Sequence, residues 1–226
     1  SMSATGAVTQ TGVLSIGGST TVQAGSSAVT LETEGNRFGG AVSVSTLGAV
    51  GLRDVDALTV SLAGTGSARL RAGGDLVAGV TGAQALALDL ASPGDARIET
   101  AGALALRAAL GAAGSDLTIR SGGALQLASV QVGGLLSIDA AGAVTQDAAL
   151  GVGGAALIRS TGSTVTLLDA GNVFGGAVKL AGTASRLFDS GPLEIELDTT
   201  GDTVIEAGGA IRASGAVKGE GSDLTL

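Results

Sequence analysis

Few side chains in this sequence could do chemistry, because its 226 residues include no Cys, His, Trp or Tyr. Without thiol and imidazole groups, a Ser-His-Asp triad, a cysteine nucleophile, a disulfide and a conventional zinc site are all excluded. Chemistry based on carboxylates or on oxygen-ligated cations remains.

Three pairs of acidic residues are the candidates for such chemistry: Asp54/Asp56, Glu194/Glu196 and Asp198/Asp202. A glycosidase needs two carboxyl groups about 5 to 9 Å apart in a cleft, with unequal pKa values. Glu194 and Glu196 flank Ile195, so in a strand both point outward. Calcium is conceivable at the first pair, but the glycine-rich nonapeptide of calcium β-rolls is absent. We therefore expect solvated acids, with no catalytic, cofactor or metal site, and no enzyme.

The scarce Asn and Phe residues also gather at one repeated position. The block Gly-Asn-x-Phe-Gly-Gly-Ala-Val occupies residues 35–42 and returns at residues 171–178. The candidate site residues are Asn36, Phe38, Asn172 and Phe174. The structural interpretation is that Asn caps or tolerates a left-handed corner, glycines supply positive φ, and Phe fills a bulge. The alternative is that the two loops protrude and bind a ligand.

This block belongs to a long internal repeat. Gly-Ala-Val-Thr-Gln at residues 6–10 returns at residues 142–146, with the same offset of 136 residues. We expect one β-helix segment over residues 3–226, with a super-repeat of about 6–141 and a partial second copy over 142–226. Ser1 and Met2 have the look of an expression-vector remnant.

A shorter period of about 19 residues subdivides the long one. Two series of mostly aliphatic positions recur every 17 to 22 residues, one through Leu70, Leu88 and Leu106, the other through Ile98, Ile119 and Ile138. The local pattern around both is alternation, which indicates strands. Together these features predict an all-β fold, a parallel β-solenoid of 10 to 11 coils with 17–22 residues per coil. Stacking at about 4.8 Å per coil gives a rod on the order of 50 Å long, with each series forming one interior column.

The handedness is a separate question. Residues 52–106 keep 18-residue steps, and several of their leucines fall on the six-residue grid of left-handed hexapeptide helices. Elsewhere that grid fails, and variable coil lengths favour a right-handed β-helix.

Charged residues support the same register. The positions that follow the two series are expected to point outward, and their signs alternate along the chain. One column contains Glu99, Arg120, Asp139 and Arg159, followed further on by Asp198 and Lys218; the other contains Arg71, Asp89 and Arg107. This alternation would disfavour slippage of one coil past the next.

Overall composition restricts the partners. The net charge of −8 opposes binding to nucleic acid or to an anionic lipid surface. The mean hydropathy of +0.49 comes mostly from alanine and alternating aliphatics, and no uncharged stretch has the roughly 18 apolar residues of a spanning helix. We therefore expect neither nucleic-acid binding nor membrane insertion.

The two repeated blocks and the Gly/Ala/Val/Leu-rich coils resemble the internal repeats of filamentous-haemagglutinin-type exoproteins of two-partner secretion. This resemblance implies a long right-handed β-helical shaft on the bacterial cell surface, secreted and involved in adhesion or virulence. The Asn-Pro motifs of that family's secretion domain do not occur here, so the chain looks like shaft. Its partners would be coils of the same polypeptide above and below it.

Two other functions stay open from the sequence. One is a carbohydrate-active β-helix, either a lyase or a tailspike-like hydrolase, although no Trp or Tyr is available to stack on sugars. The other is a module that binds a host or bacterial surface glycan or protein along one face. In each case we expect a monomer apart from contacts between the ends of rods.

Overall fold

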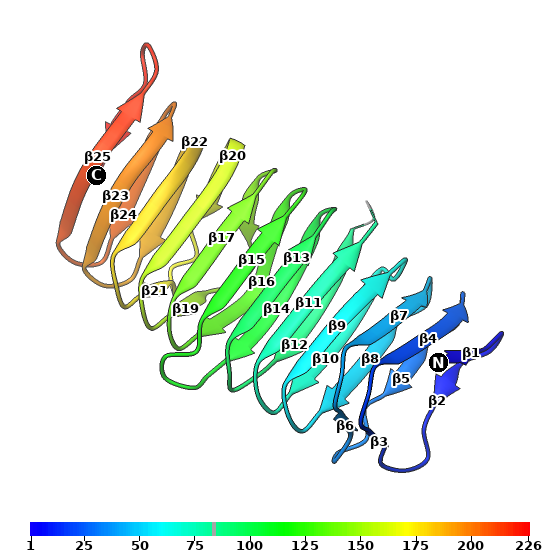
Figure 1. Cartoon of the computed structure of the whole chain (residues 1–226). Coiled ribbons are helices and arrows are strands. Elements are labelled where there is room, and N and C mark those ends of the chain that lie inside the picture. Colours follow the sequence, from blue (N-terminus) through cyan, green and yellow to red (C-terminus); the bar gives the residue numbers. More distant parts are fainter. Residues whose placement is uncertain (83–84) are drawn as a thin grey trace.

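The chain forms a long rod of stacked coils in a computed structural model that describes all residues except 83 and 84. Figure 1 shows the two termini at opposite ends of the rod, and every strand pairing between coils is parallel. About 11 turns of a right-handed β-helix follow one another, and no helix occurs in the described residues. The predicted all-β parallel β-solenoid is therefore confirmed.

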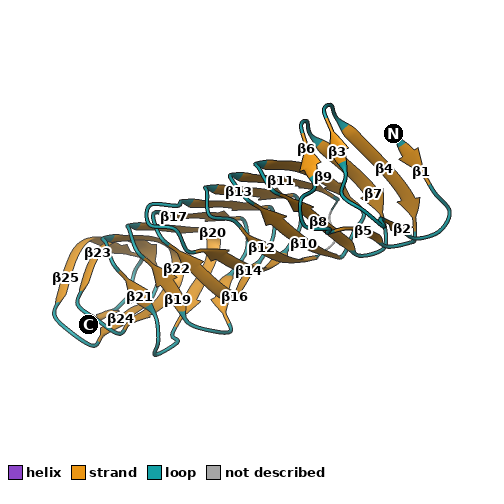
Figure 2. Cartoon of the chain, turned by 90° about the horizontal axis from the view of Figure 1, so that it is seen from below, coloured by secondary structure: helices purple, strands orange, loops and turns teal. Residues whose placement is uncertain are grey.

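The strands lie on successive faces of the rod, which Figure 2 shows from below. The first face contains β1 (Met2–Ser3), β4 (Thr20–Gly25), β7 (Val42–Thr46), β9 (Leu58–Ala63), β11 (Leu76–Thr81), β13 (Ala96–Thr100), β15 (Leu117–Ser121), β17 (Leu136–Ala140), β23 (Leu193–Thr200) and β25 (Ile211–Lys218). The second contains β2 (Val8–Thr9), β5 (Val29–Leu31), β8 (Val50–Asp54), β10 (Ser67–Ala72), β12 (Leu86–Ala91), β14 (Leu104–Leu110), β16 (Leu125–Val132), β18 (Val144–Gln146), β24 (Thr203–Ala207) and β26 (Leu224–Thr225). Long strands β20 (Ala156–Leu167) and β22 (Val178–Asp189) contribute to both faces, and short pairs are formed by β3 (Ser15–Ile16) with β6 (Arg37–Phe38) and by β19 (Leu150–Val152) with β21 (Val173–Phe174).

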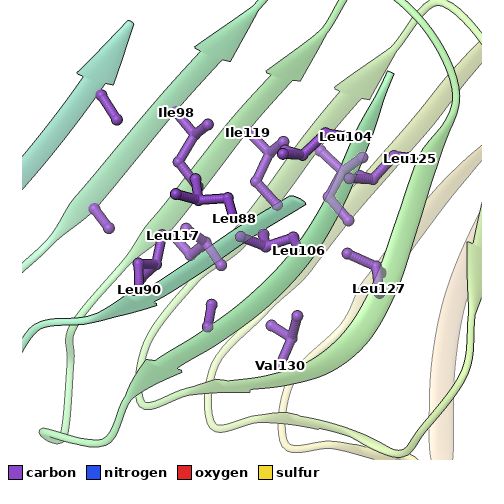
Figure 3. Close-up of a cluster of buried hydrophobic side chains, with 14 of the residues drawn as sticks. Leu88, Leu90, Ile98, Leu104, Leu106, Leu117, Ile119, Leu125, Leu127 and Val130 are labelled. Atoms are coloured by element: carbon purple, nitrogen blue, oxygen red, sulfur yellow. The ribbon is translucent and has the colours of Figure 1, made fainter. Parts of the chain in front are cut away.

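Aliphatic side chains fill the interior as continuous columns. In most strands of both faces buried residues alternate with more exposed ones, because successive side chains of a strand point to opposite sides. Ile98, Ile119 and Ile138 are in register on consecutive coils and at most 2% exposed. Figure 3 shows leucines of β12, β14 and β16 beside Ile98 and Ile119 inside the rod. A buried Leu or Ile contributes about 1.5–3 kcal/mol, so the stacked columns are the main source of stability.

The predicted coil length of 17–22 residues is also confirmed. Leu180 pairs with Leu197, which is 17 positions along the chain, and Val22 pairs with Val44, which is 22 positions along. Such variation does not fit a strict hexapeptide grid, in agreement with the right-handed helix.

One coil step of the predicted register is wrong, and it shifts both series by two residues. Leu88 does pair with Leu106, but Leu70 pairs with Leu90, and it is Ala68 that lies beside Leu88. The coil between these strands is therefore two residues longer than the sequence pattern suggested. A shift of two residues keeps every side chain on the same side of the strand, so apolar alternation cannot reveal it.

Candidate functional site

The four predicted site residues lie inside the rod. Asn36 and Asn172 are completely buried, and Phe38 and Phe174 are each 5% exposed and belong to the hydrophobic core. Neither Asn adopts a positive φ, so tolerance of a left-handed corner does not explain their use. Their side chains instead take part in a hydrogen-bond network.

In the first copy, Asn36 pairs with Gln10 through both side-chain amides. Asn36 Nδ2 donates to Gln10 Oε1 at 2.9 Å, and Gln10 Nε2 donates to Asn36 Oδ1 at 2.8 Å. The Asn36 amide also bonds two backbone groups, the Leu14 amide at 2.9 Å and the Leu31 carbonyl at 3.1 Å. A buried side chain with four hydrogen bonds has no free polar atom to offer a ligand.

The second copy repeats this arrangement at Gln146 and Asn172. The two amide hydrogen bonds are again 2.8 and 2.9 Å, and Asn172 Oδ1 accepts from the Leu150 amide at 2.9 Å. The two blocks that recur in the sequence, Gly-Ala-Val-Thr-Gln and Gly-Asn-x-Phe-Gly-Gly, therefore meet on consecutive coils. Sequence reasoning identified both blocks but not their contact; the signal was that Gln and Asn lie 26 residues apart in both copies.

The glycines after each Phe allow the coils to approach closely. Only Gly35 of the first block has a positive φ, +93°. A Cβ on Gly40 would lie 2.8 Å from the backbone of Gly18, and a Cβ on Gly175 would lie 2.5 Å from the Gly153 carbonyl oxygen. Stacked glycine pairs thus let the corners pack backbone against backbone.

Each corner also contains one buried aspartate. Asp54 is 2% exposed, in contrast to the solvated position expected from the sequence, because its carboxylate accepts backbone amides of Phe38 at 3.1 Å and Asp56 at 3.0 Å. The corresponding residue of the second copy, Asp189, is 1% exposed and accepts the Gly191 amide at 3.1 Å. Both carboxylates therefore accept backbone amides, although Asp189 Oδ2 is buried without a hydrogen-bond partner among the described residues.

The two corners differ on their outer side. Arg37 of the first block forms a 2.5 Å ion pair with exposed Asp56 of the next coil. Val173 takes the place of this arginine in the second block and is 51% exposed. The shared part of the motif is therefore internal, and its outward-facing part is variable.

The remaining acidic pairs do not converge. Glu194, Glu196, Asp198 and Asp202 are all exposed. In the described residues, no group of three or more His, Cys, Asp or Glu side chains has an arrangement that could hold a metal ion. The same residues include no helix long and apolar enough to cross a membrane.

Outer charges pair mainly with one another. Asp89 lies in register between Arg69 and Arg107, and its Oδ2 bonds Arg71 Nη2 at 2.9 Å although Arg71 itself is in register with Ala91. Partial burial acts to raise the pKa of Asp89, but the hydrogen bond from Arg71 and the nearby arginine charges outweigh it and lower the pKa. The predicted pair of Arg71 and Asp89 exists, but as a diagonal contact.

The predicted column of charged residues beside the Ile98 series also combines in-register neighbours with a diagonal contact. Glu99, Arg120, Asp139 and Arg159 are in register on consecutive coils. Asp198 is in register with Ala216, yet Lys218 Nζ reaches Asp198 Oδ1 at 2.7 Å. This hydrogen bond and the lysine charge lower the pKa of Asp198.

A column of aspartates at one corner was not foreseen. Asp75 Oδ1 accepts the backbone amide of Asp95 at 3.0 Å, and Asp95 Oδ1 accepts that of Asp116 at 2.9 Å. Asp116 Oδ1 in turn accepts the Leu135 amide. Each carboxylate therefore caps the start of a strand in the next coil. The sequence signal was Gly or Ser, then Asp, directly before each strand.

A shallow groove of about 440 Å³ lies on the outer surface of the second face. Its lining includes outward small residues of four consecutive coils: Gly51, Ser67, Ala87 and Ala105. Arg69, Asp89 and Arg107 border these positions. Because Asp89 already bonds two arginines, the charges along this border are largely satisfied by one another.

Comparison with known proteins adds one finding. A family model described as repeats of unknown function (DUF5649) matches residues 1–45 and 114–181, which together make up half of the chain. Each matched stretch contains one complete Gln–Asn pair. No curated protein and no solved structure matched the chain.

Proposed function

We propose, for a chain that belongs to the DUF5649 family of repeats of unknown function, a structural role as a shaft segment of a large secreted exoprotein of the bacterial surface. In this role the rod projects or presents other regions of its polypeptide. The coils above and below it are its immediate partners, and filamentous-haemagglutinin-type adhesins are the proteins it resembles.

One observation carries the proposal: the polar groups that recur in the sequence are used inside the rod. The amides of Gln10, Asn36, Gln146 and Asn172 bond each other and the backbone. Asp54 likewise binds backbone amides. A segment selected to catalyse or to bind would be expected to keep such groups on a concave surface.

Surface display can be tested directly. The chain would be fused behind the export domain of a two-partner exoprotein in a Gram-negative host, with the same fusion lacking that domain as the control. We expect external protease to digest the displayed segment in intact cells and to leave the control untouched. Retention of the first fusion inside the cell would contradict the shaft proposal.

The groove on the second face favours glycan binding as a second candidate function. Its floor of small side chains is open along several coils, and Arg107 offers guanidinium donors at its border. Binding to a glycan array that is lost in Arg107→Gln but kept in Arg212→Gln would support this candidate. Depolymerisation of any polysaccharide in a panel would instead support a carbohydrate-active enzyme and exclude a purely structural segment.

A further inference from the structure

The outer surface of the first face carries a column of charges whose order is self-complementary. Glu99, Arg120, Asp139 and Arg159 lie in register on consecutive coils, and all of them are exposed. Along the rod their signs read minus, plus, minus, plus. We propose that a second copy of this chain docks side by side on this face, with its rod antiparallel to the first, so that the two charge columns pair with each other.

The alternation of sign decides the direction of the partner. In the antiparallel pair a two-fold axis passes between the coils of Arg120 and Asp139. Arg120 then faces the partner's Asp139, and Glu99 faces the partner's Arg159. Each contact occurs twice, because an isologous interface applies the same contacts to both copies. In a parallel pair each charge would face its own equivalent, so electrostatic complementarity selects the antiparallel rod.

Part of this column has no counter-charge within its own chain. Glu99 forms an ion pair with Arg97 and lies 3.9 Å from Arg120. Asp139 and Arg159, in contrast, form no salt bridge with any residue that the structure describes. The second copy supplies the missing counter-charges, since its arginine and glutamate lie opposite these two side chains.

The neighbouring outward column fits the same axis. It contains Arg97, Thr118, Ser137 and Leu157, in register on the same coils. Its middle residues are small, so they do not hold the two charge columns apart. Leu157 is 48% exposed and faces the partner's Arg97, whose aliphatic stem can cover it. The antiparallel pair therefore buries an exposed leucine as well as joining charges.

Charges further along the face do not oppose this docking. The next strands on one side of the axis, β22 and β23, present Lys179, Glu196 and Asp198. The strands that face them in the partner, β11 and β9, contain no charged residue. Like charges, which would cost binding energy, are therefore absent opposite these described strands.

The first face is large enough for a specific contact. Strands β9, β11, β13, β15, β17, β20, β22 and β23 stack on it one after another, with the two-fold axis at their middle. At about 4.8 Å per coil and about 17 Å per strand, their outward surface measures roughly 650 Å² on each copy. A total of about 1,300 Å² lies at the lower end of the range for specific interfaces. The contact uses the side of the rod, so it is independent of the export proposed above.

Sedimentation of charge-reversed variants tests the inference. We expect the parent chain to double its mass as its concentration rises and to dissociate in about 1 M salt, because the ion pairs are exposed. Arg120→Glu and Asp139→Arg should each remain monomeric, since each places like charges opposite one another. An equimolar mixture of the two variants should form dimers, because the reversed side chains then face each other across the axis.

A matched control makes the same charge change elsewhere. Arg107→Glu lies on the outer surface of the second face, and we expect it to dimerise as the parent does. A parent that stays monomeric at every concentration, or an Arg120→Glu protein that dimerises like the parent, would overturn the proposal. A mixture that stays monomeric although circular dichroism shows both variants folded would also overturn it.

Cross-linking tests the antiparallel direction separately. The chain has no cysteine, and exposed Ala101 and Thr161 border the same hollow of the first face, three coils apart. In the antiparallel pair Ala101 faces the partner's Thr161, whereas identical positions lie about 14 Å apart along the rod. We expect a short thiol cross-linker to join Ala101→Cys protein to Thr161→Cys protein and to join neither with itself. Self-linking of Ala101→Cys alone would reject this arrangement.

Discussion

Gln146 and Asn172 hold each other through two antiparallel amide hydrogen bonds of 2.8 and 2.9 Å. They lie on consecutive coils and bring together two sequence blocks that recur with an offset of 136 residues. In a solenoid whose aliphatic columns are nearly interchangeable from coil to coil, such a pair specifies which corner stacks on which.

The interior columns should not accept a charge. Leu88 is 2% exposed, so Leu88→Asp would bury a carboxylate without a partner and should cost more than about 3 kcal/mol, unfolding several coils. Urea unfolding followed by circular dichroism measures this. Ala87→Asp is the matched control, because Ala87 points outward from the same strand. Equal stability of the two variants would place Leu88 outside the core.

Close stacking of the corners should make some glycines irreplaceable. A Cβ at Gly133 would lie 1.9 Å from the carbonyl oxygen of Ala112, whereas one at Gly66 would have no neighbour within 4 Å. Neither glycine has a positive φ, so packing alone distinguishes them. Gly133→Ala should destabilise the rod by about 1–3 kcal/mol, and Gly66→Ala should be close to neutral in the same denaturation assay. Similar effects of both substitutions would refute this packing argument.

Replacing Ala184 by glycine should stabilise the fold. Ala184 has a φ of +28°, a conformation that strains a residue with a Cβ. Ala184→Gly removes that strain and should raise the free energy of unfolding by up to about 1 kcal/mol, provided that relief exceeds the added entropy of the unfolded chain. Thermal unfolding gives the sign directly, and a lower melting temperature would count against strain at this position.

The ion pairs around Asp89 should make stability depend on pH in the acid range. Its pKa is lower in the folded chain than the ordinary value of 3.8, so it stabilises the fold above that value. This contribution is lost as the pH falls through the lower, folded-state pKa. Asp89→Asn should therefore lose stability at pH 7 and much less at pH 2 to 3. If Asp89→Asn lowers the free energy of unfolding by the same amount at both pH values, Asp89 acts by packing instead.

The sequence predicted the fold because alternation and repetition act over the whole chain. It did not predict the register between β10 and β12, since a two-residue shift leaves Leu70 and Leu88 facing inward in either case. It also placed Asp54 in solvent. The burial of Asp54 depends on a backbone amide of another coil, and the residues next to Asp54 in the sequence do not reveal that contact. The repeated Asn attracted attention for its scarcity, but its partner could be recognised only once the corners were positioned.

A double-mutant cycle on Gln146 and Asn172 tests most directly the central claim, that the repeated polar block is an internal structural contact. Gln146→Leu and Asn172→Leu should each cost about 2 kcal/mol, because each leaves its partner's amide, which is buried in Asn172 and half-buried in Gln146, without its side-chain hydrogen bonds. The double variant should cost at least about 1 kcal/mol less than the sum of the two. Gln23→Leu, at an exposed position, is the control and should be nearly neutral. Strictly additive costs, or single variants as stable as the parent, would contradict the claim.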